Sequence, residues 1–427
     1  MLLLVEKISE TVSLLLFFYI TVFAVPDFEK CAGFASIDGE GNQKLVGGVT
    51  GGAGGQIVTV KNVEDLVKYC SQKGPLTIVI EGTIKIPNDK NLGTLTEAKK
   101  ANPGFTKPAV LPYSVWVTSD KTIIGKGKNA VIKSGGFVIG SWDEEVGFNN
   151  SVVTPPADAI HNIIIRNITF DLSGGPKSET DGISIFMHAH HIWVDHCSFK
   201  STPDGALDVK RGSNYCTFSY NHFMGTNKTC LCGHNDGNGK QDIGFLKTTY
   251  HHNYFQSTKQ RGPRVRFGMV HVLNNYYSNI GSYGIGTGKQ CRVYSEKNIL
   301  EGGTFSKNYG GGVYEDHGSV IKGDKGGGRE GSVGWKPSDF YSYTADEPAT
   351  AKELATKYAG AGKVDFEIKT GLKPIFKTIT PSHNIKKNKN SRFAFSLLGK
   401  NYTNYRGIET NKAVGIYITG FTNKWIR

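Results

Sequence analysis

No apolar run in this 427-residue sequence is long enough to cross a bilayer comfortably. The run near the N-terminus, Val12–Ala24, has 13 residues, whereas a membrane-spanning helix needs about 20. A short apolar core that ends in Val-Phe-Ala is instead typical of a secretory signal peptide. We therefore expect residues 1–24 to be a signal peptide and the protein to be secreted and extracellular, without a membrane anchor. Four sequons are compatible with glycosylation after export: Asn149, Asn167, Asn227 and Asn401.

Acidic side chains are in deficit. The chain has 37 Asp and Glu against 50 Lys and Arg, which gives a formal net charge of +13. Such an excess attracts polyanions, which can be nucleic acids, anionic membranes or acidic polysaccharides. The sequence also lacks a basic, aromatic RNA-binding motif, and export separates the protein from nucleic acid. We therefore expect no nucleic-acid partner.

The cysteine pattern lacks the spacing of a zinc site. Cys230, Cys232 and His234 form a C-x-C-x-H cluster without a second half of the usual kind, so structural cysteines are the favoured interpretation. The total of seven cysteines is odd, so at least one thiol stays unpaired even where export permits disulfides. We predict one pair, Cys31 with Cys70, and leave the partners of the other cysteines open.

Glycine and aromatic residues, by contrast, are abundant. The chain contains 54 glycines, 23 phenylalanines and 19 tyrosines, spread through short β-type runs. This composition indicates many strands and many turns rather than disorder or a collagen-like helix. The length allows one large domain or two ordinary ones, each with a sizeable core. We expect an all-β protein.

One short sequence motif, which we call the strand phrase, recurs from Ile163 onward. Its copies are IIIRNITF, IWVDHCSF, CTFSYNHF, TTYHHNYF, VHVLNNYY and VYSEKNIL, and each closes on an Asn or His anchor. The anchors lie 29, 25, 32, 22 and 23 residues apart: Asn167, His196, Asn221, Asn253, Asn275 and Asn298. A period in this range, with glycines between the strands, is the signature of a solenoid.

Stacking explains the repeat physically. A single coil cannot bury its apolar face, but coils stacked as parallel strands bury all of these faces. Asn at a recurring angle can hydrogen-bond to Asn in the coils above and below, as in other stacked β-structures. We therefore predict a right-handed, single-stranded parallel β-helix. An ordinary β-sandwich whose strands end in Asn is the alternative that the unequal spacing leaves open.

The remaining segments fit this plan less sharply. Residues 51–70, GGAGGQIVTVKNVEDLVKYC, predict a Gly-rich turn, a strand and a short helix that caps the N-terminal end of the stack. The phrase is no longer recognisable after about Gly303, and Ala345–Gly360 has helical composition. We assign residues 25–364 to the β-helix domain and residues 365–427 to a C-terminal extension of uncertain order.

Charged residues recur at similar offsets from the anchors. Asp181, Asp208 and Arg261 lie 15, 13 and 14 residues before the anchors of their coils. If each anchor marks the same angular position around the β-helix axis, these three side chains face the same side of the β-helix. Asp181 and Asp208 then occupy adjacent coils. Arg261 lies two coils past Asp208, roughly 10 Å along the axis at a coil spacing of about 4.8 Å.

Two further carboxylates and a lysine join this group. Asp204 and Glu179 have the strand spacing that places them on the same face as Asp208 and Asp181. Lys228 belongs to the 32-residue coil between the acidic and basic residues, and we expect the insertion in this coil to form a loop beside the cleft. Exposed carboxylates in a cluster repel one another unless a cation binds, and oxygen-only ligands favour Ca²⁺ over zinc.

A surface salt-bridge network is the alternative interpretation of these acids, with Arg261, Arg264 and Arg266 of the motif RGPRVR as partners. Asp195 and His196 are a different case. They belong to the strand phrase itself, and acids are rarely buried unless paired. We therefore interpret them as a satisfied buried pair rather than as catalytic groups.

Three long segments carry a family resemblance. They are WVDHCSF (Trp193–Phe199), DGALDVKRGSNYCTFSYN (Asp204–Asn221) and RGPRVRFGMVHVLNNYY (Arg261–Tyr277). These segments resemble the characteristic motifs of the pectate lyases of polysaccharide lyase family 1. The resemblance keeps good register from about Gly47 to Gly303 and extends more loosely through AGAGK at Ala359–Lys363.

The resemblance implies a parallel β-helix enzyme that cleaves polygalacturonate, the acidic polysaccharide of plant cell walls, by Ca²⁺-assisted β-elimination. By motif position, Asp181, Asp204 and Asp208 match the calcium-binding acids of the family. Glu179 stands where the family often has another Asp. The implied cofactor is Ca²⁺, and we expect a monomer.

The resemblance also implies roles for the basic residues. Arg261 matches the catalytic arginine of the family, and Lys228 and Arg266 match its substrate-binding bases. Arginine normally titrates above about 12, so an arginine base predicts an alkaline pH optimum. A glycan on Asn227 would crowd the cleft beside Lys228.

Two other functions stay open. A pectin lyase acts on methyl-esterified polymer without calcium and has little use for an acidic cluster. A non-catalytic polysaccharide-binding β-helix needs no base opposite a metal cluster. Both fit these residues less well than a secreted pectate lyase that releases 4,5-unsaturated oligogalacturonates.

Overall fold

The computed structural model describes four stretches of the main unit, Met1–Lys377: residues 26–88, 113–140, 153–175 and 180–368. The expected signal peptide and Glu179 lie outside the described residues. A separate unit contains the antiparallel pair β27 (Ser396–Leu397) and β28 (Lys400–Asn401). No helix in the described ranges is long and apolar enough to span a membrane.

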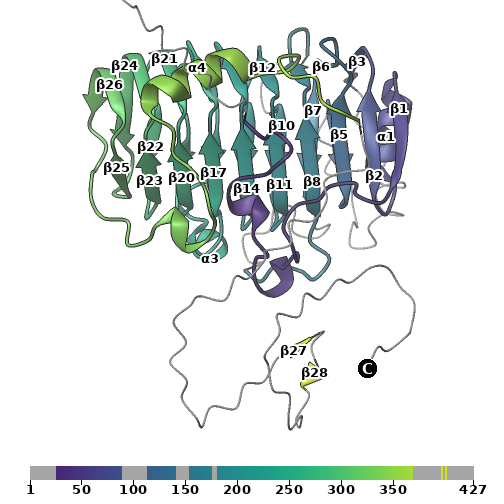
Figure 1. Ribbon diagram of the computed structural model, residues 1–427, viewed down its shortest axis with the longest axis horizontal. Helices are drawn as coiled ribbons and strands as arrows, with labels where there is room; N and C mark the ends of the chain where they lie inside the picture. The colour runs from purple at the N-terminus through teal and green to yellow at the C-terminus, as the bar shows by residue number, and fades with distance from the viewer. Residues whose placement is uncertain are drawn as a thin grey trace, which may run out of the picture. The chain divides into compact units, whose positions relative to one another are not determined.

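The first ladder of the main unit consists of ten parallel strands that follow one another along the axis (Figure 1). Its strands are, in spatial order, β1 (Gln56–Val60), β2 (Leu76–Ile80), β5 (Lys121–Gly125), β8 (His161–Arg166), β11 (His190–Asp195), β14 (Asn214–Ser219), β17 (Thr248–His251), β20 (Met269–Leu273), β23 (Arg292–Glu296) and β25 (Val313–His317).

Two further parallel ladders are joined into one 16-stranded sheet by β24 (Ile299–Asn308). The second ladder holds β3 (Thr83–Lys85), β6 (Val131–Lys133), β9 (Thr169–Asp171), β12 (Ser198–Lys200), β15 (His222–Met224), β18 (Tyr254–Gln256), β21 (Tyr276–Ile280), β24 and β26 (Val320–Gly326). The third ladder holds β4 (Ser114–Val117), β7 (Gly136–Ile139), β10 (Ile183–Ile185), β13 (Leu207–Val209), β16 (Leu231–Cys232), β19 (Arg264–Val265), β22 (Ile285–Thr287) and again β24. Each full coil runs through the three ladders in turn, which confirms the predicted parallel β-helix.

Two α-helices pack against parts of the β-helix. α1 (Val63–Ser71) starts at the N-cap residue Asn62 and buries Leu66 in the core beside the first coils, so the predicted capping helix is confirmed (Figure 1). α4 (Pro348–Tyr358) forms in the segment of helical composition and packs Ala355 against the second ladder.

A buried asparagine ladder runs along the turn between the first and second ladders, as predicted. Nδ2 of Asn221 donates to Oδ1 of Asn253 at 3.0 Å, and Nδ2 of Asn253 donates to Oδ1 of Asn275 at 2.9 Å. The step from Asn275 to Asn298 is 3.1 Å, and the backbone N–H of Asn298 then donates to Oγ of Ser319. Ser319 belongs to a last coil, β25 to β26, which the phrase did not reveal because serine replaces the asparagine.

Two of the predicted anchors do not belong to the ladder. The pairing of β9 with β12 and of β12 with β15 places Ile168 and Cys197 level with Asn221. Asn167 and His196 precede these positions by one residue and have left-handed φ angles of 58° and 49°, which turn the chain between strands. The Asn167 side chain is buried, so this sequon is inaccessible in the folded protein.

The cysteine prediction is partly wrong. All seven cysteines are free and buried, so Cys31 and Cys70 form no disulfide. Cys31 packs beside Trp193, whereas Cys70 points from α1 into the core, where burial raises the pKa of its thiol to about 12. Cys230 and Cys232 lie in the core, which agrees with a structural role.

Candidate active site

Five of the predicted site residues line one cavity of about 500 Å³ beside the third ladder. They are Asp181, Asp204, Asp208, Lys228 and Arg261. The prediction that Asp181, Asp204, Asp208 and Arg261 share a face is therefore confirmed, and Lys228 joins them. The coil of Asp208 follows that of Asp181 directly, and the coil of Arg261 lies two coils further along, in the order β10, β13, β16 and β19.

The assumption that each anchor marks the same angle on its coil is wrong for His196. β10 pairs with β13 so that Ser184 is opposite Asp208, which leaves Asp181 level with Gly205. The offsets mislead for two reasons. His196 lies one residue before the true ladder position, and the turns between ladders differ in length from coil to coil.

Asp181 and Asp208 converge above Gly205. The backbone N–H of Gly205 donates to Oδ1 of Asp181 at 2.9 Å. A Cβ atom on residue 205 would stand 2.7 Å from Oδ1 of Asp181 and 2.5 Å from Oδ1 of Asp208. Only glycine leaves this space open. Two carboxylate oxygens therefore face one small volume. Carboxylate oxygens are the donors that Ca²⁺ prefers.

Lys210 is a site residue that the sequence analysis missed. Its Nζ lies 2.7 Å from Oδ2 of Asp181 and 3.4 Å from Oδ2 of Asp208. Burial and the Asp181 charge raise the pKa of Asp208 to about 7. Burial would also raise the pKa of Asp181, but Lys210 holds that pKa below its usual range. The sequence did contain a sign of this contact. Lys210 follows Asp208 by two residues, and this spacing places both side chains on one face of a strand.

Asp204 has a lysine partner as well. Nζ of Lys228 lies 2.9 Å from Oδ1 of Asp204, and both side chains are partly exposed. Lys228 itself stands level with Gly205, in an isolated β-bridge. The three described acids are thus paired with lysines, so the alternative of a network with the RGPRVR arginines is wrong. Within the described ranges, no three His, Cys, Asp or Glu side chains are positioned to hold a metal.

Arg266 lies beside the cavity and is held by the insertion of the 32-residue coil. Its Nε donates to Oδ1 of Asp236 at 2.7 Å, and Nη1 donates to the carbonyl groups of Gly233 and His234. The insertion contains the short helix α3 (Gly239–Asp242) and brings His234 to the cavity wall. The predicted loop beside the cleft is confirmed. Burial and nearby cations lower the pKa of His234 to about 4, so its ring is neutral near pH 7.

Arg261 provides a guanidinium group without an anionic partner in the described part of the chain. Its backbone has a left-handed φ of 66°, and its carbonyl accepts from the N–H of Cys230 at 2.7 Å. Nε is buried and makes no hydrogen bond. The charge of Arg261 acts to lower the pKa of Asp208, which shows that the two groups interact. Among the described residues, the site therefore combines acids paired with lysines and the guanidinium of Arg261, which has no ion-pair partner.

Asp195 and His196 form a buried pair, as predicted, but only Asp195 is satisfied, because neither ring nitrogen of His196 makes a hydrogen bond. Nδ1 of His196 lies 2.8 Å from Oδ2 of Asp195, which also accepts from Nε of Arg166 at 2.9 Å. Oδ1 of Asp195 accepts from the Ser219 hydroxyl at 2.6 Å. This network lies at the first ladder, and none of its members lines the cavity of the third ladder.

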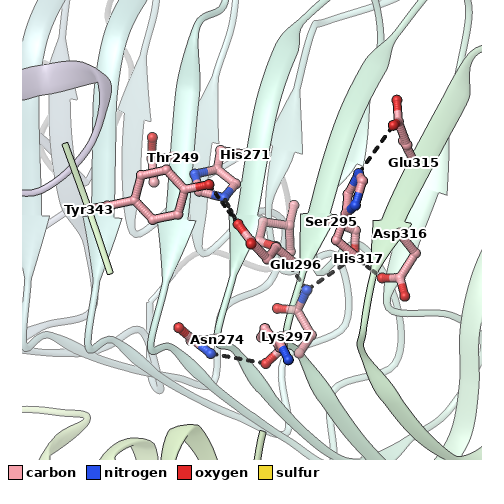
Figure 2. Close-up of polar contacts among 12 residues, drawn as sticks. Thr249, His271, Asn274, Ser295, Glu296, Lys297, Glu315, Asp316, His317 and Tyr343 are labelled. Atoms are coloured by element: carbon pink, nitrogen blue, oxygen red, sulfur yellow. Dashed lines mark hydrogen bonds and ion pairs between the residues drawn. The ribbon is translucent and has the colours of Figure 1, made fainter. Parts of the chain in front are cut away.

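A second polar cluster on the first ladder also contains residues of catalytic type. Figure 2 shows Tyr343 beside Glu296 and His271; the Tyr343 hydroxyl donates to Oε2 of Glu296 at 2.7 Å, and Nε2 of His271 lies 3.5 Å from the same oxygen. His271 is fully buried, and burial lowers its pKa. These contacts fasten the segment around Tyr343 to the coils, so we assign the cluster a structural role.

Comparison with known proteins agrees with this architecture. The protein-family model for pectate lyase matches residues 29–364. A pectate trisaccharide-lyase from Thermotoga maritima is 33% identical over 381 residues, which cover 79% of this chain and 90% of that protein. A pectate lyase from Bacillus subtilis is 30% identical over 406 residues, with coverage of 74% and 90%.

Solved structures give the same result. A thermostable pectate lyase is 25% identical, with a TM-score of 0.60 and coverage of 80% of this chain and 100% of that one. A pectate lyase bound to a hexasaccharide is 28% identical, with a TM-score of 0.60 and coverage of 78% and 98%. The long family match, the relatives at 30% identity or more and the shared β-helix together show that this chain belongs to the pectate lyase family.

Proposed function

We propose that the protein is a secreted, monomeric pectate lyase that cleaves polygalacturonate by Ca²⁺-assisted β-elimination and leaves 4,5-unsaturated ends. One observation carries the proposal. A converging pair of carboxylates, Asp181 and Asp208, shares a cavity with the unpaired guanidinium of Arg261. A related pectate lyase, 25% identical, has been solved with trigalacturonate, which supports an acidic oligosaccharide as the substrate.

The chemistry of the donors suits calcium, although the described acids are arranged around lysines rather than around one metal position. Asp181, Asp204 and Asp208 offer only oxygen atoms, which suits a hard cation. Lys210 supplies one positive charge between two of these acids, and Ca²⁺ would replace it as their counter-ion. Glu179, the fourth acid of the prediction, lies outside the described residues. Bound Ca²⁺ would withdraw charge from the sugar carboxylate and stabilise the enolate-like intermediate.

The basic residues would position the sugar and move one proton. Lys228 and Arg266 bind carboxylates of the substrate, Arg266 with the N–H groups that remain after its contacts with Asp236, Gly233 and His234. The neutral form of Arg261, a small fraction that grows at alkaline pH, accepts the C5 proton, which is α to a carboxylate. The electron pair of that C–H bond forms the C4–C5 double bond, and the C4–O4 bond breaks with its electrons on the leaving oxygen, which takes a proton from water. Holding the chain in register lowers the barrier to this step.

The decisive assay follows the absorbance of the unsaturated product, with and without Ca²⁺ and across pH. Polygalacturonate should be cleaved faster than highly methyl-esterified pectin, with an alkaline optimum. EDTA should abolish turnover and added Ca²⁺ should restore it. Cleavage that is unaffected by EDTA would exclude the calcium mechanism, preference for esterified pectin would indicate a pectin lyase, and binding without product would indicate a non-catalytic β-helix.

A further inference from the structure

A second cavity, lined entirely by other described residues than the candidate active site, lies on the first ladder. Its volume is about 540 Å³, which is in the range that holds a small organic ligand. Three parts of the chain line it: the ends of strands β11, β14, β17 and β20, the N-terminal segment around Phe28, and the segment from Tyr343 to Leu354. The contact of Tyr343 with Glu296 fastens the last of these to the coils (Figure 2). The proposed reaction makes no use of this cavity.

One column of side chains forms the inner wall of the cavity. Asp195, Ser219, His251 and Leu273 are the last residues of four successive strands, and they lie in register. The Ser219 hydroxyl donates to Oδ1 of Asp195 at 2.6 Å and accepts from Nε1 of Trp193 at 2.8 Å. The Ser219 hydroxyl therefore already has both a donor and an acceptor.

His251 is different, because one of its ring nitrogens has no partner. The residue is only 8% exposed, and its Nε2 makes no hydrogen bond within the described part of the chain. The other nitrogen, Nδ1, lies 3.0 Å from Nδ1 of His252, and Nε2 of His252 lies 2.9 Å from Oδ2 of Asp346. A buried nitrogen without a partner costs free energy, and the cavity that His251 lines gives a partner room to bind.

This chain of contacts determines which nitrogen carries each proton. A carboxylate accepts, so Nε2 of His252 donates to Asp346, and in the neutral ring Nδ1 of His252 accepts from Nδ1 of His251. Burial and the neighbouring His252 lower the pKa of His251 well below its usual range, so this ring is also neutral. Nε2 of His251 is therefore a hydrogen-bond acceptor. Asn274 keeps Asp346 in place, because it accepts from the N–H and donates to the carbonyl of that residue.

The shape of the wall favours a ligand with an apolar, aromatic body. Five side chains with large apolar surfaces line the cavity: Phe28, Trp193, Tyr220, Leu273 and Leu354. The Tyr220 ring is held by stacking on His252, with 4.8 Å between the ring centres, and aromatic rings pack well against one another. A sugar carries several hydroxyl groups and would leave some of them unpaired among these side chains.

The charges of the wall favour a neutral ligand. Four charged side chains line the cavity: Asp27, Lys30, Asp195 and Asp346. The carboxylates outnumber the lysine, so an anion such as galacturonate is repelled. Asp195 is paired with Arg166, and Asp346 is paired with His252, so neither is left to hold a cation.

We propose that this cavity binds a phenol, a neutral aromatic molecule whose O–H donates to Nε2 of His251 while its ring packs among the apolar side chains. The site is separate from the third ladder, so this inference does not depend on the proposed function.

The test uses the full chain and two similar bicyclic probes, 2-naphthol and 2-methoxynaphthalene, at pH 7, where both are neutral. Only 2-naphthol has a hydroxyl that can donate. It should bind about tenfold more tightly than 2-methoxynaphthalene, the effect of one hydrogen bond to a buried acceptor. The anion 2-naphthoate should bind at least tenfold more weakly than 2-naphthol. Fluorescence titration measures all three dissociation constants.

Three variants locate the binding site. Thr350→Trp places a large ring at the cavity wall and should raise Kd for 2-naphthol at least tenfold. Thr356→Trp is the matched control, because Thr356 is an exposed residue of the same helix, α4, and its Kd should stay within twofold of wild type. His251→Phe keeps a ring but removes the acceptor, so the two neutral probes should bind with equal affinity.

Several results would overturn the proposal. They are no binding of 2-naphthol to the wild-type protein, equal affinity of that protein for the two neutral probes, equally tight binding of 2-naphthoate, and binding that survives Thr350→Trp. Circular dichroism tests the fold of each variant. Should His251→Phe fail to fold, the probe pair and Thr350→Trp decide the question, because Thr350 is only partly buried. None of these measurements requires turnover of polygalacturonate.

Discussion

The ammonium group of Lys210 lies 2.7 Å from the Asp181 carboxylate. It also lies 3.4 Å from Asp208, so one lysine neutralises the two converging acids. A divalent cation that binds these acids competes with this lysine. The stability of the site should therefore depend on which cation is present.

Lys210→Met should lower the stability of the calcium-free protein by about 3 kcal/mol, because removing one partner of a buried ion pair leaves the other charge uncompensated. Added Ca²⁺ should restore much of the loss, since it binds the folded state alone. Calorimetry in EDTA and then in excess Ca²⁺ measures both effects. Lys322→Met is the control, because Lys322 pairs with Glu301 at the surface and its loss should barely change Tm. Equal Tm values for the two variants in EDTA would contradict the prediction.

Arg261→Lys should fold normally and lose cleavage by about 10³-fold, as expected when a general base is misplaced. Lysine keeps the charge, but its ammonium cannot occupy the same positions as the planar guanidinium. Initial rates on polygalacturonate measure the loss, and circular dichroism with thermal unfolding tests the fold. Arg292→Lys is the matched control. A folded Arg261→Lys variant within tenfold of wild type would limit Arg261 to positioning the substrate.

Asp242 should give the stability a distinct pH dependence. Its Oδ1 accepts from the N–H of Gly212 at 2.8 Å, Oδ2 has no partner, and burial raises its pKa to about 6. A raised carboxyl pKa stabilises the folded state below the unfolded pKa of about 4, and this contribution is lost as pH rises through about 6.

Asp242→Asn keeps the acceptor but does not ionise, so it should remove this dependence. The stability of the variant relative to wild type should increase by about 2 kcal/mol between pH 4 and 7. Urea unfolding at a series of pH values measures the difference. Parallel pH profiles for the two proteins would show that Asp242 is not the responsible group.

Asn253→Ala should lower the free energy of unfolding by about 3 kcal/mol, because it interrupts the asparagine ladder in its middle. The change removes the acceptor of two buried Asn221 donors, the backbone N–H and one Nδ2 hydrogen, whereas Oδ1 of Asn275 keeps the backbone N–H of residue 253. Urea unfolding provides the measurement. Asn42→Ala removes an exposed amide that donates to the Pro155 carbonyl and should have little effect. Similar losses for both variants would mean that the ladder adds no stability of its own.

The repeat was predictable because its physical requirements are local. Every coil needs an apolar strand, and every turn at the ladder needs a group that can hydrogen-bond along the axis, so Asn221, Asn253, Asn275 and Asn298 mark the stack directly. The last coil was missed where Ser319 fulfils the same need with a different side chain. The prediction of a Cys31–Cys70 disulfide failed because no local pattern says which thiols lie close together.

The types of residue in the site, and the coil on which each lies, were predictable from the sequence. Asp181, Asp208 and Arg261 share a face and are separated by the expected numbers of coils. Their position along each coil was not predictable, because it depends on turns of unequal length. The function proposed for them still depends on the assays above.

The sequence by itself determined the stacked parallel strands and the inventory of acids and bases on one face, because apolar periodicity and strand alternation are properties of the chain alone. Tertiary structure decided the partners: that Lys210 joins Asp181 to Asp208 and that Arg261 has no ion-pair partner among the described residues. Ion pairing depends on distances of a few ångströms between side chains on different coils. Such distances are set only when the turns have fixed how each coil lies on the next.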